Sequence, residues 1–113
     1  MYLDEYKRWL AADLEDADLK PELAKVEGND DEIKDRFAVA LKFGTAGLRG
    51  TMCVGLHQMN IHVIRWATQG FANVICAEGE EAKRRGVALC MDCRNHSMEF
   101  ARAAAEVCAA NGI

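Results

Sequence analysis

At 113 residues, the chain is long enough for one small domain and too short for two. Half of its residues are hydrophobic and 28% are charged, which is ordinary globular composition, and no apolar stretch approaches the length of a membrane span. The amino-terminus lacks the basic start and apolar stretch of a signal peptide, so we expect a cytoplasmic protein with reduced cysteines and no membrane partner.

Charge is unevenly distributed along the chain. Residues 1–35 contain 12 acidic and 5 basic side chains, whereas the remaining residues contain 6 acidic and 9 basic ones. The second part therefore suits anionic ligands better than the first. Its one tight basic group, Lys83 to Arg85, directly follows Glu80 and Glu81, and this arrangement favours a self-paired surface segment over a nucleic-acid site.

Residues 1–40 have the pattern of helices. Asn29 to Glu32 form an acidic start for a helix that carries Ile33 and Phe37, and Pro21 stands where a first helical turn tolerates proline. Near the amino-terminus, apolar residues recur every three or four positions: Leu3, Tyr6, Leu10 and Leu14. We expect a helical amino-terminal leader.

The pattern changes at Phe43 and becomes that of an α/β protein. Residues 51–54 are a candidate short strand, and Asn60 is a candidate cap for a long helix over residues 61–75. The apolar run over residues 86–91 predicts a strand buried on both faces of a parallel sheet, and a helix follows from about Ser97 to residue 111.

A strand followed by a helix needs a returning parallel strand to complete the unit. The chain stops at Ile113, where that return would begin. We therefore expect the amino-terminal piece of a longer α/β protein.

Cys90 and Cys93 have the C-x-x-C spacing of zinc and thiol-redox sites, with His96 three residues further on. A redox pair needs its reactive thiol at a helix amino-terminus, whereas Cys90 falls inside the predicted strand, and a structural zinc site needs a second pair of ligands. Buried, reduced thiols are the favoured interpretation.

The remaining candidates for catalysis are Ser97 and the histidines. Ser97 follows His96, but a serine at a helix start most often caps the first-turn amides, and that role is favoured over a nucleophile. His57 and His62 have no carboxylate or thiol at helical spacing beside them, so both are interpreted as ordinary surface or core histidines.

The segment F-G-T-A-G-L-R-G, residues 43–50, is the strongest candidate for a ligand site. It is not a Walker loop, because no G-K-[ST] follows, and it is not a dinucleotide fingerprint, because a strand comes next. Its glycines allow main-chain amides to approach a ligand, and Arg49 offers a planar fork that suits phosphate oxygens. A tight turn whose arginine pairs with the acidic helices explains the composition equally well.

Five short motifs occur in order between residues 40 and 113: F-G-T-A-G-L-R-G at 43–50, M-N at 59–60, A-T-Q-G at 67–70, D-x-R at 92–94 and A-A-N-G-I at 109–113. Together they resemble the start of an α-D-phosphohexomutase of the phosphoglucomutase/phosphomannomutase family. The resemblance is greatest to the branch that includes phosphoglucomutase-2-like and phosphopentomutase-like enzymes. It implies residues 1–40 as a helical leader and residues 41–113 as the first part of domain I, with a mixed sheet and flanking helices.

The resemblance also implies a function in carbohydrate metabolism. Such isomerases move a phosphoryl group between positions of a phosphorylated sugar through a phosphoserine and a sugar bisphosphate, with Mg²⁺ on the phosphoserine. Arg49 would contact the phosphoserine and the phosphoryl group in transfer. Thr45 and Gly44 would shape the same wall of the site, while Asp92 and Arg94 would order a nearby loop.

The sequence also departs from the family pattern. The phosphoserine motif T-A-S-H-N-P is absent and Ser97 is not its serine, so we expect the nucleophile, the metal ligands and the remaining domains beyond this chain, which alone would be inactive. His57-Gln58 replaces the usual Asn-Arg, and Asn95-His96 departs from the commoner order. A non-catalytic remnant, a partner-binding module, and a nucleotide-binding or C-x-x-C redox domain are the alternatives.

Overall fold

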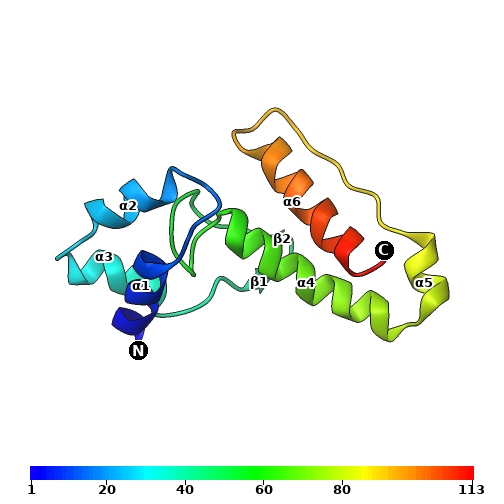
Figure 1. Ribbon diagram of the computed structural model, residues 1–113, viewed down its shortest axis with the longest axis horizontal. Helices are drawn as coiled ribbons and strands as arrows, with labels where there is room; N and C mark the ends of the chain where they lie inside the picture. Colours follow the sequence, from blue (N-terminus) through cyan, green and yellow to red (C-terminus); the bar gives the residue numbers. More distant parts are fainter. The chain divides into compact units, whose positions relative to one another are not determined.

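The computed structural model describes residues 1–113 and contains two compact units, residues 1–63 and 64–113 (Figure 1). No helix combines the length and apolarity that crossing a membrane would require. The elements, in chain order, are α1 (Tyr2–Ala11), α2 (Leu19–Lys25), α3 (Asp30–Phe37), β1 (Phe43–Gly44), β2 (Gly47–Leu48), α4 (Ile61–Ala77), α5 (Glu80–Arg85) and α6 (Ser97–Ala110).

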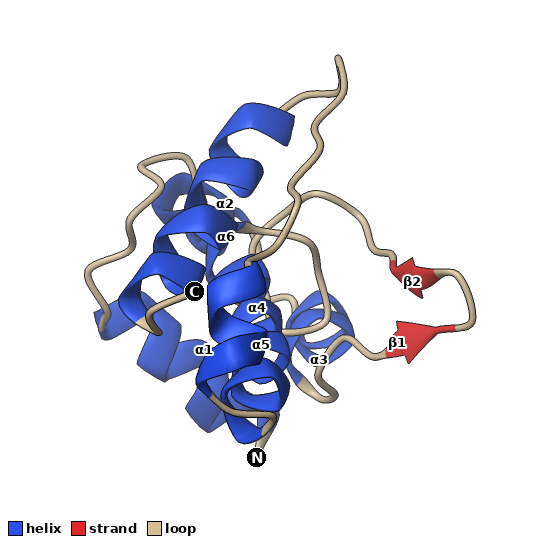
Figure 2. Ribbon diagram, turned by 90° about the vertical axis from the view of Figure 1, so that its right-hand side faces the viewer, coloured by secondary structure: helices blue, strands red, loops and turns tan.

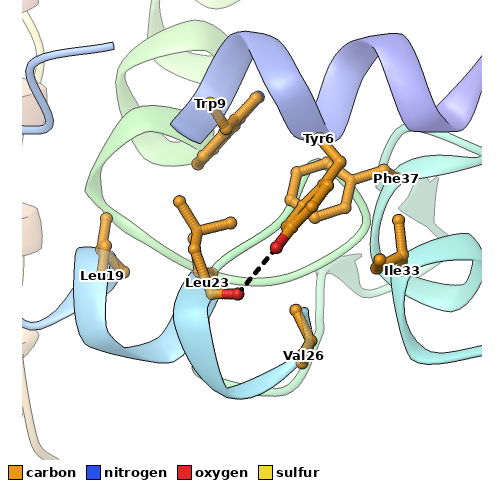
Figure 3. Close-up of a cluster of buried hydrophobic side chains, with 8 residues drawn as sticks. Tyr6, Trp9, Leu19, Leu23, Val26, Ile33 and Phe37 are labelled. Carbon is orange, nitrogen blue, oxygen red and sulfur yellow. Dashed lines mark hydrogen bonds between the residues drawn. The ribbon is translucent and has the colours of Figure 1, made fainter. Parts of the chain in front are cut away.

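The first unit is built around an aromatic and aliphatic cluster between α1, α2 and α3 (Figure 3). The rings of Tyr6 and Trp9 on α1 each meet the ring of Phe37 edge-on, with centroids 5.7 Å apart. The Tyr6 hydroxyl donates a hydrogen bond of 3.0 Å to the carbonyl of Leu23, so its polar end is satisfied inside the core. The buried members are Tyr6, Trp9, Leu19, Leu23, Val26, Ile33, Phe37 and Val54.

Two asparagines begin the helices that the sequence predicted. The Asn29 side chain accepts a hydrogen bond of 3.3 Å from the amide of Glu32 at the start of α3. Asn60 accepts one of 3.1 Å from the amide of Val63 at the start of α4. Each side chain satisfies an amide that the helix itself leaves without a partner, and the predicted cap at Asn60 is confirmed.

The only sheet is the two-stranded antiparallel pair β1 and β2. The strand predicted over residues 51–54 is reduced to a single parallel bridge between Met52 and Met59. The strand predicted over residues 86–91 is wrong, because this segment has no regular secondary structure, and Leu89 and Met91 are exposed. A strand requires a neighbouring strand for its amides and carbonyls, and the chain places none beside residues 86–91.

In the second unit, polar side chains connect α4 to α6. Arg65 donates to the carboxylate of Glu106 at 2.6 Å, and Gln69 exchanges two hydrogen bonds with Asn111, of 3.1 and 2.9 Å. Small residues occupy the interior, since Ala72 and Ala103 are at most 1% exposed. The predicted helix after Ser97 is confirmed, and its small side chains give the unit a thin core.

The charged segment Glu80–Arg85 forms the short helix α5. Lys83 pairs with Glu80 at 3.2 Å, and Arg84 pairs with Glu81. The expected self-pairing is therefore present, although it joins residues three positions apart rather than four.

Replacing Leu23 by alanine tests the core of the first unit. Leu23 is fully buried, so Leu23→Ala should lower the free energy of unfolding by about 2–5 kcal/mol through lost burial and the cavity that remains. Urea unfolding measures this. Leu10→Ala, at a position that is 36% exposed on α1, is the matched control and should cost much less. Equal losses in the two variants would contradict this description of the core.

Candidate functional site

The segment 43–50 forms a hairpin with a two-residue tip (Figure 2). Phe43 pairs with Leu48 and Gly44 with Gly47, which leaves Thr45 and Ala46 at the turn. Gly47 has a φ of +111°, a conformation that side-chain-bearing residues rarely adopt, so the glycine is required there. The hairpin places Gly44 and Thr45, both proposed ligand-facing residues, on an exposed edge.

Arg49 follows β2 directly and is exposed. The structure shows no hydrogen bond or ion pair of its side chain, and the pairing with the acidic helices that the composition allowed is absent. The guanidinium keeps all of its donors available for an anionic ligand.

The turn after the hairpin, residues 53–60, contains the departures His57 and Gln58. Gln58 is 7% exposed, and its amide donates a hydrogen bond of 3.4 Å to the carboxylate of Asp35 on α3. The main-chain amide of His57 donates to the carbonyl of Arg36 at 2.9 Å. Both residues therefore belong to the contact with α3, and no local sequence pattern pointed to that contact.

His62, predicted to be an ordinary surface or core histidine, is half-buried in the first unit. Its Nε2 accepts a hydrogen bond of 3.3 Å from the amide of Glu15, and its ring meets Trp9 edge-on at 5.7 Å. The imidazole therefore contacts both the main chain after α1 and the aromatic cluster of the first unit.

The loop before α6 is ordered by Asp92. Its carboxylate accepts hydrogen bonds from the amide of Arg94 at 3.0 Å and from the Arg94 guanidinium at 2.7 Å. The guanidinium is the main reason that the pKa of Asp92 falls to about 2. This geometry agrees with a loop-ordering role for the pair.

The predicted cap at Ser97 is wrong. His96 precedes the helix in a left-handed conformation with a φ of 62°, and Ser97 is already the first helical residue. The Ser97 hydroxyl instead accepts a hydrogen bond of 3.0 Å from the amide of Asp92. Serine hydroxyls often form such local hydrogen bonds to main-chain amides, and here the partner is in the loop before the helix rather than in its first turn.

Cys90 and Cys93 are exposed free thiols, so the expectation that both are buried is wrong. Their burial was to come from a strand inside a sheet, and residues 86–91 form no strand. No group of three or more His, Cys, Asp or Glu side chains is arranged to hold a metal ion anywhere in the chain.

The carboxylate of Asp92 offers a direct test of the loop. With a pKa of about 2 in the folded protein against an ordinary 3.8, Asp92 stabilises the fold above pH 3.8, and that contribution disappears as the pH falls through about 2. Carboxyl NMR titration should show this low midpoint in the wild type. Arg94→Gln should return the midpoint toward the ordinary value, whereas Arg84→Gln on α5 should leave it low. An ordinary midpoint in the wild type would contradict the ion pair.

Residues 40–113 match the family model described as "Phosphoglucomutase/phosphomannomutase, alpha/beta/alpha domain I". A phosphopentomutase of Homo sapiens is 37% identical over 93 residues, which cover 77% of this chain and 15% of that protein. A phosphomannomutase of Mycoplasma pneumoniae is 32% identical over 97 residues, covering 85% and 17%, and a phosphoribomutase of Saccharomyces cerevisiae is 40% identical over 74 residues, covering 66% and 12%.

The chain spans about 15% of the length of the phosphopentomutases that it matches. No solved structure matches it significantly. The α/β/α description of the matched domain agrees with the expected α/β fold class, and with helices accompanied by a small sheet. Because the family model covers well over half of the sequence, the chain belongs to the phosphoglucomutase/phosphomannomutase family.

Proposed function

We propose that the protein is a phosphosugar mutase, an isomerase that moves a phosphoryl group between two positions of a sugar. A hexose would exchange between its 1- and 6-phosphates, and a pentose between its 1- and 5-phosphates. The family match supports this proposal, as do relatives named phosphopentomutase, phosphomannomutase and phosphoribomutase. Because the chain spans a small part of those relatives, the activity is proposed for the intact protein.

Arg49 is the residue of this chain that we propose acts on the phosphoryl group. A phosphoryl group in transfer carries negative charge on its equatorial oxygens, and a planar guanidinium can bind two of them at once. The observation that carries this role is that Arg49 is exposed, beside a glycine-containing hairpin, without an acidic partner. Gly44 and Thr45, at the exposed edge, would form the adjoining wall of the site.

The phosphoserine, the Mg²⁺ and the sugar bisphosphate belong to the same proposal, but the residues of this chain do not fit a metal site. The hydroxyl of Ser97 already accepts a hydrogen bond from the amide of Asp92. The nucleophile, in the rest of domain I, and the metal ligands would therefore come from parts of the enzyme outside this chain.

A partner-binding module without catalytic activity is the second candidate. The observation in its favour is a set of exposed apolar side chains on α4: Trp66, Phe71 and Val74, each more than half exposed. A monomeric protein seldom leaves such residues together in solvent. An intact protein without mutase activity would favour this candidate.

Arg49→Lys in the intact protein tests the proposed function. Lysine keeps the charge but loses the two-pronged fork, so turnover of a sugar 1-phosphate should fall roughly a hundredfold to a thousandfold. The melting temperature should hardly change, because Arg49 makes no contact that stabilises the fold.

Arg85→Lys, an exposed change on α5, is the matched control and should retain full turnover. Steady-state kinetics and a melting curve on the same samples separate the two effects. A destabilised but fully active Arg49→Lys variant would end the catalytic assignment.

A further inference from the structure

Both ends of the hairpin segment are attached to the same turn, residues 53–60. On the entering side, the amide of Leu41 donates a hydrogen bond of 3.0 Å to the carbonyl of Leu56. On the leaving side, the amide of Met59 donates one of 2.8 Å to the carbonyl of Thr51. Any displacement of the turn therefore moves both ends of the segment that carries Arg49.

Hydrogen bonds from the helices of the first unit hold the 53–60 turn in place. The main-chain amide of Val54, which is fully buried, donates a hydrogen bond of 2.7 Å to the carboxylate of Glu22 on α2. The guanidinium of Arg36 on α3 donates one of 3.4 Å to the Val54 carbonyl. Two side chains of opposite charge, from two helices, thus satisfy both main-chain groups of one residue.

Close packing leaves the turn little freedom to shift. A Cβ atom at Gly55 would lie 2.8 Å from the Cβ of Arg36 and 2.9 Å from its carbonyl oxygen, so the main chain lies directly against α3. The Asn60 side chain links the end of the turn to its start, since its amide donates hydrogen bonds to the carbonyls of Cys53 at 3.0 Å and Gly55 at 2.9 Å.

We propose that Glu22 is a positioning residue for the reaction: its carboxylate fixes the 53–60 turn and, through the turn, the segment that presents Arg49. This inference rests on the proposed function, because it assumes that Arg49 binds the transferring phosphoryl group. Glu22 lies on α2, before the residues 40–113 that match the family domain. The helical leader therefore contributes directly to the geometry of the site.

The test uses three variants of the intact protein. Glu22→Ala removes the acceptor of the Val54 amide, and a displaced Arg49 should lower kcat roughly tenfold to a hundredfold while KM changes little. Glu22→Gln keeps an oxygen acceptor and should recover most of the loss. Tyr6→Phe, the matched control, removes the hydrogen bond to Leu23 on the same helix α2, and should lower the melting temperature without lowering kcat.

A double variant separates positioning from general stability. If Glu22 acts through Arg49, Glu22→Ala should change kcat by less than about twofold once Arg49→Lys is present, because the effects of coupled residues do not add. Effects that multiply in full would overturn the proposal. A Glu22→Ala variant that loses only thermal stability, as Tyr6→Phe does, would also overturn it.

Hydrogen exchange distinguishes failure of this inference from failure of the proposed function. In Glu22→Ala the amides of Leu41, His57 and Met59 should exchange faster than in Tyr6→Phe, whether or not the protein has mutase activity. Wild-type protein inactive on every sugar phosphate would refute the proposed function. Unchanged exchange at these three amides would refute the anchoring by Glu22.

Discussion

The main-chain groups of Val54 impose the constraint on which the first unit depends. Val54 is fully buried, and a buried amide or carbonyl without a partner costs about as much as a lost hydrogen bond. Glu22 supplies the acceptor and Arg36 the donor, so α2 and α3 must both be in place before the turn can be buried. The aromatic cluster of the leader and the turn that follows the hairpin are consequently one structure, although they lie far apart in the sequence.

The parts of the fold that the sequence predicted well are those with local causes. The helix α4 follows from its apolar spacing and from Asn60, whose side chain reaches an amide three residues away. The prediction fails at residues 86–91, because an apolar run shows only that a segment would suit burial in a sheet. It does not show that a neighbouring strand is present for that segment to pair with. Without a neighbouring strand to pair with, the same residues remain irregular and exposed.

In the candidate site, too, the features with local causes could be predicted from the sequence, and those that depend on tertiary structure could not. The glycines and Arg49 could be selected from the sequence, because their chemistry does not depend on distant residues. Whether Arg49 has an acidic partner could not be decided, since 12 acidic residues precede it and their distance is set by tertiary structure. The contact between Gln58 and Asp35 was missed for the same reason: 23 positions separate the two residues, and neither has a local pattern that points to the other.

The free energies of ordering a residue and of forming a hydrogen bond explain why the anchored ends of the hairpin segment matter as much as its arginine. Ordering the backbone of one free residue costs about 1–2 kcal/mol, while a hydrogen bond to a charged group contributes about 1.5–3 kcal/mol. An arginine on a segment with free ends would therefore lose most of its binding energy to ordering its neighbours. With Leu41 and Thr51 already bonded to the 53–60 turn, the remaining cost is mainly that of the side chain, about 2 kcal/mol. Two hydrogen bonds to a phosphate can exceed that cost, so the anchoring of the segment determines whether Arg49 can stabilise a transferring phosphoryl group.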